Sequence, residues 1–243
     1  MSDTSKEPAS PRHRSDPTPL ADLDSRRSGL DPTIGARLTR RVVALGAEST
    51  GTTTLAEQLA ERLDAPSVPE FLRHYAEERA AEAGSIWDVT WTTDDFDTVA
   101  EGQDRLEAEI VTAWASNADR SSPTPMSPPL VVCDTDALAT AIWHRRYVGS
   151  PAPRFLRRAT ERRVTLYLLT SPAGVDFEQD GLRDGEHIRE EMTGWFRDAL
   201  HEQDAPWIEV TGSTSERLGQ AIEAIGQITS EPVLKQGIEQ RQR

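Results

Sequence analysis

The sequence has almost no lysine. Its lysines are Lys6 and Lys235, and both lie near the ends of the 243-residue chain. No lysine in the interior of the chain is therefore available to hold an anionic ligand. A cation that contacts such a ligand must be an arginine, a bound metal ion or a group from another chain.

Cysteine and long apolar runs are also scarce. Cys133 is the single cysteine, which excludes a disulfide within the chain. No apolar run is long enough to span a bilayer, and the first residues lack the apolar centre of a signal peptide. We therefore expect a cytoplasmic protein.

The charge balance is strongly acidic. The formal net charge is -14 at pH 7, which argues against a nucleic-acid partner and against binding to an anionic membrane surface. The composition gives no indication of the oligomeric state.

Composition divides the chain into three segments. Residues 1–38 are rich in Ser, Pro, Asp and Arg and have almost no apolar periodicity, so we expect a disordered N-terminal tail. Residues 39–229 are sufficient for one α/β domain. Residues 230–243 are expected to form a flexible C-terminal tail.

Between these tails, short apolar runs alternate with helical patterns. Strands are predicted at 42–45, around 65–70, and at 130–134, 164–169 and 207–210, and helices at 55–63, 71–82, 96–114, 137–147, 153–163, 188–201 and 214–228. Loops are predicted at 121–129 and, as a mobile segment, at 174–187. This alternation predicts an α/β fold with a five-stranded parallel sheet and helices on both faces. Ligands of such sheets bind at the carboxyl ends of the strands.

The first strand and the first helix are joined by a loop between two glycines. Backbone N–H groups of such a loop, together with the helix dipole, form an anion site, and the glycines let a phosphate approach closely. Thr53 occupies the Mg²⁺-binding position of the motif GxxxxGK[ST], and Thr52 occupies the lysine position. An ordinary strand-to-helix turn is the alternative. The predicted phosphate-binding residues are Gly46, Ala47, Glu48, Ser49, Thr50, Gly51, Thr52, Thr53 and Thr54.

Two aspartates follow the strand at 130–134. Asp134 ends the apolar run, as expected of a carboxylate that faces a Mg²⁺ ion or its water ligands. Asp136 stands at the start of the next helix and is a candidate base or substrate contact. The alternative is that either aspartate only caps the helix.

Glu70 and Arg73 follow the predicted second strand. A carboxylate at Glu70 is placed to accept the proton of an attacking hydroxyl group. Arg73, three residues later on the same helix face, is placed to hold Glu70 or the substrate. A solvated ion pair near a helix start is the alternative.

Arg183 and Arg189 lie in the polar segment at 174–187 and in the helix after it. Arginines on a mobile loop are suited to close over phosphates and to stabilise charge in the transition state. Ordinary charges on an exposed loop are the alternative. Trp87 and Trp91 lie in irregular chain near the expected substrate cleft, although most tryptophans belong to a core.

Five strings occur in the order and spacing of one family. They are GAESTGTTTLAEQLA, PEFLRHYAEE, FDTVAEGQ, VVCDTDALAT and DGLRDGEHIR. Together they make residues 41–228 resemble the nicotinamide riboside kinase domain of the bacterial NadR family and related AAA-type P-loop ATPases. The DNA-binding and adenylyltransferase functions of NadR are not carried over, because residues 1–38 are too short and too polar for either module.

The resemblance implies a P-loop NTPase three-layer sandwich that uses ATP and Mg²⁺. Its reaction transfers the terminal phosphate of ATP to the 5′-hydroxyl of nicotinamide riboside. By position, residues 46–54 would hold the phosphates, and Thr53 and Asp134 would bind Mg²⁺. The other implied residues are Glu70, Arg73 and Asp136 in the substrate cleft and Arg183 and Arg189 as lid arginines.

Thr52 in place of the lysine leaves more than one functional hypothesis. The first is a small-molecule kinase for a nucleoside such as nicotinamide riboside. The second is a catalytically weak nucleotide-binding switch or sensor, and the third is a protein whose loop is vestigial and serves only for interaction. The sequence does not distinguish ATP from GTP.

Overall fold

The computed structural model describes residues 40–117, 130–183 and 185–230. The predicted N-terminal tail at 1–38, the predicted loop at 121–129 and residues 231–243 of the predicted C-terminal tail lie outside the described residues.

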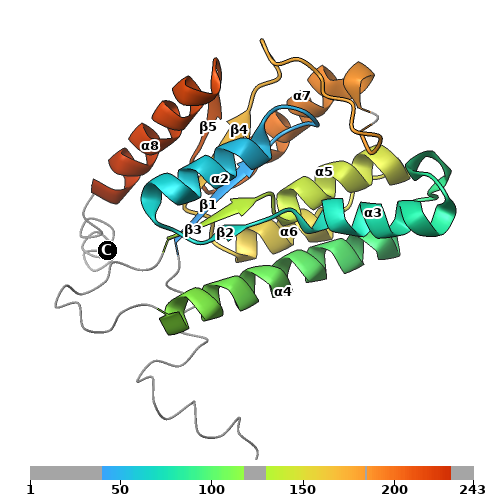
Figure 1. Cartoon of the computed structure of the whole chain (residues 1–243), viewed down its shortest axis with the longest axis horizontal. Helices are drawn as coiled ribbons and strands as arrows, with labels where there is room; N and C mark the ends of the chain where they lie inside the picture. The colour runs from blue at the N-terminus through green and yellow to red at the C-terminus, as the bar shows by residue number, and fades with distance from the viewer. Residues whose placement is uncertain (1–39, 118–129, 184, 231–243) are drawn as a thin grey trace, which may run out of the picture. The chain divides into compact units, whose positions relative to one another are not determined.

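A five-stranded parallel sheet forms the centre of the described chain (Figure 1). The strand order is β2-β3-β1-β4-β5, and every pair of neighbours is parallel. This confirms the predicted fold class. The strands are β1 (Arg40–Leu45), β2 (Ser67–Val68), β3 (Leu130–Asp134), β4 (Leu166–Thr170) and β5 (Trp207–Val210).

Strand β2 has only two residues, at the edge of the sheet. Pro66 and Pro69 flank it and lack the N–H groups that would extend its hydrogen-bonding ladder. Pro66 still contributes through its carbonyl oxygen, which accepts a hydrogen bond from Val132 N at 3.0 Å. A strand this short is enough to bring Glu70 to the carboxyl edge of the sheet.

Seven α-helices occupy the described residues, at or near the predicted positions, together with two 3₁₀ turns that were not predicted. Helix α4 begins earlier than predicted and ends later. The helices are α2 (Thr52–Leu63), α3 (Phe71–Ala83), α4 (Thr93–Asn117), α5 (Ala137–Val148), α6 (Pro153–Glu161), α7 (Arg189–His201) and α8 (Thr214–Ser230), with 3₁₀ turns η2 (Ile86–Asp88) and η3 (Glu186–Ile188).

The two faces of the sheet bury separate apolar cores. Val42 and Ala44 of β1 pack with α2 and α8 on one face. Val43 and Leu45 point to the other face and pack with residues of α4, α5, α6 and α7. Because successive strand side chains point to opposite faces, an uninterrupted apolar run is what a sheet covered on both sides requires. The predicted three layers are therefore present in the structure.

None of the helices in the described residues combines the length and the apolar character that crossing a membrane would require.

Candidate functional site

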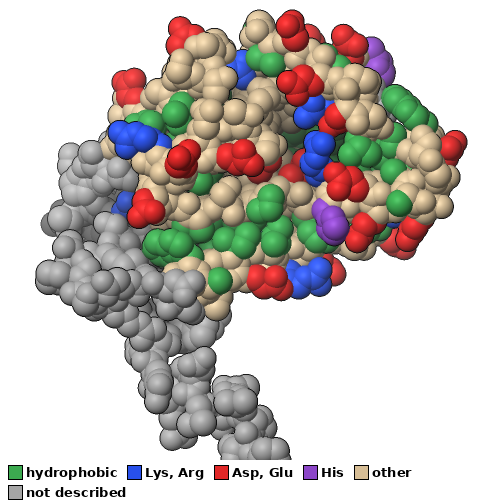
Figure 2. Space-filling view, in the orientation of Figure 1, with side chains coloured by type: hydrophobic (Ala, Val, Ile, Leu, Met, Phe, Trp, Pro, Cys, Tyr) green, Lys and Arg blue, Asp and Glu red, His purple; other side chains and the backbone are tan. Residues whose placement is uncertain are grey.

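A cavity of about 470 Å³ opens at the carboxyl edge of the sheet. Ligand pockets in proteins usually enclose about 300–1,000 Å³, so this cavity is large enough for a small organic molecule. On the face shown in Figure 2, acidic and basic side chains meet in the hollow beside the start of α2. The lining comes from residues 46–55, Glu70, Leu72, Arg73, Ala76, Ile86, Trp91, Asp134, Thr135, Trp143, Tyr147, residues 174–176, Glu178, Leu182, Arg183, residues 212–214 and Arg217.

All nine residues of the predicted phosphate-binding loop line this cavity. Gly51 has a φ of 83°, a left-handed conformation that glycine adopts without strain. Gly46 is so close to β4 that a Cβ atom would collide with the Thr170 hydroxyl. The tight turn and the close packing therefore explain both glycines.

The N-terminus of α2 has no side-chain cap. Helix α5 differs, because Asp136 accepts a hydrogen bond from Leu138 N at 2.8 Å. The first N–H groups of a helix need an acceptor, and the helix dipole favours an anionic one. In α2 these groups adjoin the cavity, so the start of this helix is suited to bind a phosphate.

Thr52, at the lysine position, belongs to a cluster of hydroxyl groups. Its Oγ1 lies 3.1 Å from Thr170 Oγ1, which in turn lies 2.6 Å from Thr50 Oγ1. Thr50 Oγ1 donates to the carbonyl oxygen of Ala47 at 2.7 Å. The base of the loop is thus held by threonine hydroxyls and carries no ammonium group there.

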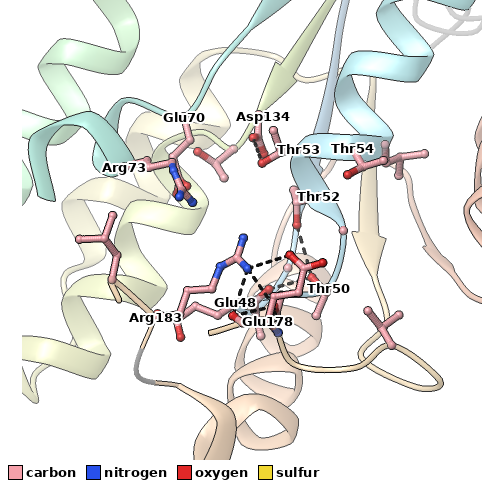
Figure 3. Close-up of a pocket in the computed structure, with 18 of the residues that line it drawn as sticks. Glu48, Thr50, Thr52, Thr53, Thr54, Glu70, Arg73, Asp134, Glu178 and Arg183 are labelled. Carbon is pink, nitrogen blue, oxygen red and sulfur yellow. Dashed lines mark hydrogen bonds and ion pairs between the residues drawn. The ribbon is translucent and has the colours of Figure 1, made fainter. Parts of the chain in front are cut away.

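Thr53 and Asp134 are brought together as predicted. Thr53 Oγ1 donates to Asp134 Oδ2 at 2.6 Å (Figure 3). Burial raises the pKa of Asp134 to about 6, and the hydrogen bond from Thr53 opposes this rise. A divalent cation would favour the ionised form. One hydroxyl and one carboxylate fit Mg²⁺, which takes few protein ligands and completes its shell with water and phosphate oxygens.

Glu70 lies beside Asp134 in the cavity lining, directly before α3 (Figure 3). Its side chain makes no capping bond to that helix and lines the cavity. Burial and the negative charge of Asp134 raise the pKa of Glu70 to about 8, and the positive charge of Arg73 opposes this rise. A carboxyl group with this pKa is suited to accept a proton near neutral pH.

Arg73 and Arg183 extend toward the same part of the cavity from different elements (Figure 3). They share one carboxylate: Asp180 Oδ2 lies 2.7 Å from Arg73 Nη2 and 3.5 Å from Arg183 Nε. Arg183 Nη1 also donates to Ser49 Oγ at 3.1 Å. Of the two partners considered for Arg73, Glu70 or the substrate, Glu70 is not its ion-pair partner in the described residues, where Arg73 pairs with Asp180 and Glu77.

Arg189 does not reach the cavity, contrary to the predicted position of a lid arginine. Its guanidinium group donates to the carbonyl oxygens of Glu48 at 3.1 Å, Ser49 at 2.6 Å and Val175 at 2.9 Å. These bonds hold it against the backbone of the loop. The Glu48 side chain also leaves the loop, because it accepts bonds from Arg146 Nη1 at 3.2 Å and Gly185 N at 2.6 Å.

Asp136 also lies outside the residues that line the cavity. It caps α5, as the alternative interpretation held, and Oδ2 accepts a hydrogen bond from Tyr167 Oη at 2.8 Å. The separation from Asp134 arises at Thr135, whose φ of 69° is strained for a β-branched residue. This conformation turns the chain so that Asp134 faces the cavity and Asp136 faces the core.

Asp136 should make stability depend on pH. Burial raises its pKa from 3.8 to about 6, so its contribution to stability is complete below about pH 4 and is lost as the pH rises through about 6. The decrease in the free energy of unfolding should be about 3 kcal/mol, at 1.36 kcal/mol per pKa unit. Asp136→Asn should remove this component, measured by urea denaturation between pH 4 and 7. The matched change Asp97→Asn, at an exposed carboxylate, should leave the slope unchanged.

Two residues that contact the loop carried no signal in the sequence. Arg217 donates to the carbonyl oxygen of Thr50 at 2.7 Å, and Thr170 contacts both Thr50 and Thr52. Of the two tryptophans expected near the cleft, Trp91 lines the cavity, whereas Trp87 is 63% exposed. Trp143 and Tyr147 complete the aromatic part of the lining.

The sheet order and the loop between β1 and α2 place this chain among the P-loop NTPases. The chain belongs to the AAA domain family, whose sequence profile matches residues 41–217. No curated protein sequence matches it.

Solved structures of NadR have the same fold. NadR in complex with NR superimposes with a TM-score of 0.62 at 22% identity, covering 83% of this chain and 54% of the NadR chain. NadR in complex with NAD and AMP-PNP gives 0.59 at 22% identity, with 83% and 52% covered. This chain therefore spans about half the length of the NadR chains that it matches.

Proposed function

We propose that the protein is an ATP- and Mg²⁺-dependent kinase that phosphorylates nicotinamide riboside or a similar nucleoside at its 5′-hydroxyl. One observation carries the proposal: a single cavity connects the phosphate-binding loop, the Thr53–Asp134 pair, Glu70 and a group of aromatic side chains. A binding site for ATP alone has no need of Glu70, a half-buried carboxylate in the cavity lining, or of the aromatic part of that lining. NadR, which shares the fold, has been solved with NR and with AMP-PNP.

The aromatic end of the cavity suits a flat acceptor ring. Trp91 and Tyr147 have ring centroids 5.5 Å apart, and Tyr147 stacks on Trp143 at 6.2 Å. Leu72 and Ile86 add apolar surface. Aromatic side chains bind planar rings through stacking and through their large apolar area, so this end favours a nucleoside over an unsubstituted sugar.

Three groups of residues would share the work of phosphate transfer. The loop amides and the start of α2 bind and orient the phosphates, and Thr53 and Asp134 would hold Mg²⁺, which neutralises phosphate charge when bound. Glu70, when ionised, accepts the proton of the attacking hydroxyl group. Arg73 and Arg183 stabilise the charge that develops on the transferred group.

Thr52 favours a second candidate, a nucleotide-binding switch that turns over slowly. A hydrogen bond to a charged group contributes about 1.5–3 kcal/mol, so loss of the lysine weakens nucleotide binding roughly tenfold to a hundredfold if nothing compensates for it. The rate is more sensitive than the affinity, because positive charge is needed most in the transition state.

An assay of ADP release distinguishes the two candidates. The protein is incubated with ATP, Mg²⁺ and a panel of nucleosides that includes nicotinamide riboside. ADP release that depends on a nucleoside supports the kinase. Tight ATP binding without turnover supports the switch, and absence of ATP binding refutes both.

Thr52→Lys should raise the affinity for ATP by roughly tenfold to a hundredfold, by the magnitudes given above. Isothermal titration calorimetry of ATP in the presence of Mg²⁺ measures this change. Gln58→Lys is the matched control, because it adds the same charge on the same helix at a position outside the cavity lining. A lower affinity in Thr52→Lys would show that this loop does not bind phosphate as other P-loops do.

A further inference from the structure

Two arginines bind the phosphate loop from its carbonyl side. Arg189 of α7 donates to the carbonyl oxygens of Glu48 and Ser49, and Arg217 of α8 donates to the next carbonyl oxygen, that of Thr50. Three consecutive peptide groups of the loop are thus bound by guanidinium groups from elements distant in sequence.

Arg217 is a buried cation without a carboxylate partner among the described residues. It is 4% exposed, and its three nitrogens donate to the carbonyl oxygens of Thr50 at 2.7 Å, Ser171 at 2.9 Å and Gly212 at 2.8 Å. Burial, and then the positive charge of Arg189, lower the pKa of Arg217. A buried charge is normally neutralised by an opposite charge. Carbonyl dipoles supply only part of that compensation here.

The orientation of the peptide groups transmits this charge to the cavity. In a planar trans peptide, the carbonyl oxygen and the N–H of the following residue point in opposite directions. Because the carbonyl groups of residues 48–50 point at the two arginines, the N–H groups of residues 49–51 point away from them. The guanidinium groups therefore stabilise a loop conformation in which the positive N–H ends of these peptide dipoles are free to face a bound anion.

We infer that Arg189 and Arg217 are positioning residues that supply, through the peptide groups of the loop, the positive potential that a lysine at position 52 would supply directly. The anion that completes their neutralisation is the phosphate chain of a nucleotide. This inference rests on the proposed nucleotide binding. Neither guanidinium group needs to touch the ligand, since all three nitrogens of each donate to carbonyl oxygens.

The inference predicts an effect that grows with ligand charge. Removing one positive charge should weaken ATP binding on the order of tenfold, weaken ADP binding less, and leave adenosine binding unchanged. Loss of a purely structural brace would instead weaken ATP and ADP binding by the same factor in Arg217→Gln and Arg217→Lys, because both substitutions remove the fork of donors that holds the loop.

The test measures the dissociation constants of ATP, ADP and adenosine by calorimetry with Mg²⁺ present. Arg217→Gln keeps a hydrogen-bond donor and removes the charge, whereas Arg217→Lys keeps the charge and loses the fork of donors. The charge-dependent loss is expected in Arg217→Gln, with most of the ATP affinity kept in Arg217→Lys. Arg154→Gln, at an exposed pair with Asp97, is the control and should not change the ratio of ATP to adenosine affinity.

A double variant of Thr52 and Arg217 separates the effect of the arginine charge from the effect of its hydrogen bonds. Arg217→Gln should cost less ATP affinity in a Thr52→Lys chain than in the unchanged chain, because the lysine already supplies the positive potential that the arginine provides. If Arg217→Gln shows no cooperative thermal unfolding, Arg189→Gln replaces it and should show the same dependence on ligand charge.

Provided that the unchanged chain binds ATP, two outcomes overturn the inference alone. The first is an equal loss of ATP affinity in Arg217→Gln and Arg217→Lys, and the second is an equal cost of Arg217→Gln with and without Thr52→Lys. An unchanged chain that binds no ATP overturns the proposed function and this inference together.

Discussion

Arg183→Gln is expected to lower kcat by about 10³–10⁵-fold, the range that an arginine at the transferred phosphoryl group contributes in phosphotransferases. The guanidinium group of Arg183 lines the cavity and is held near the loop through Ser49 Oγ at 3.1 Å. With Thr52 at the lysine position, few positive groups face the phosphates directly. The contribution of Arg183 to the transition state should therefore be large.

Single-turnover kinetics with ATP and the accepted nucleoside measures this effect. The affinity for ATP should change much less than kcat, because the developing charge is greatest in the transition state. Arg197→Gln removes an arginine that pairs with Glu209 at 2.8 Å and should have nearly normal kcat. Equal rates for Arg183→Gln and the unchanged protein would exclude Arg183 from the chemical step.

Glu70→Gln should lower kcat by about 10²–10⁴-fold, the usual contribution of a general base. The amide has nearly the same shape but cannot accept the proton of the hydroxyl group. A base acts in its ionised form, so kcat/KM of the unchanged protein should rise with pH up to about 8, where the pKa of Glu70 lies in the ligand-free protein. That rise should be absent from the residual activity of Glu70→Gln.

Glu78→Gln is the matched control for this change. Glu78 lies on α3, the helix that Glu70 precedes, and pairs with His74 at the surface, so its loss should leave both kcat and the pH profile as they are. If Glu70→Gln retains full activity, the proton is accepted elsewhere, for example by solvent.

Strands β1, β3 and β4 were predictable because they are short apolar runs that must be buried on both faces, whereas β2, between two prolines, was expected only because a crossover helix must return to the sheet. The helices followed from their apolar periodicity, and the carboxyl edge of the sheet then placed Thr53, Glu70 and Asp134 together. The structure shows all three in one cavity. Local pattern and one topological rule were sufficient for this part of the site.

The roles of the two aspartates after β3 were not predictable. Asp134 and Asp136 are two residues apart, and for either of them a helix cap was the alternative interpretation. The left-handed backbone at Thr135 decides which one faces the cavity. Threonine seldom adopts this conformation, so no propensity argument could have assigned it.

The side chains that hold the loop also could not be predicted from the sequence. Thr170 and Arg217 contact Thr50 across separations of 120 and 167 residues. Such contacts depend on how β4 and α8 pack beside β1, and hydrophobic periodicity does not encode which polar side chain is brought there. Arg189 was predicted to belong to the site, but the direction of its side chain was not predicted. A side chain at the start of α7 has several carbonyl oxygens within reach.

Asp180 competes with any incoming anion for two arginines of the cavity. Its carboxylate occupies Arg73 and Arg183 at the same time, so any anion that enters must exchange with it. A singly charged ion gains little from that exchange, whereas a polyphosphate that reaches both arginines and the loop gains at several points. If the protein binds a nucleotide as proposed, this carboxylate would favour extended, highly charged ligands over the chloride and inorganic phosphate of the surrounding solution.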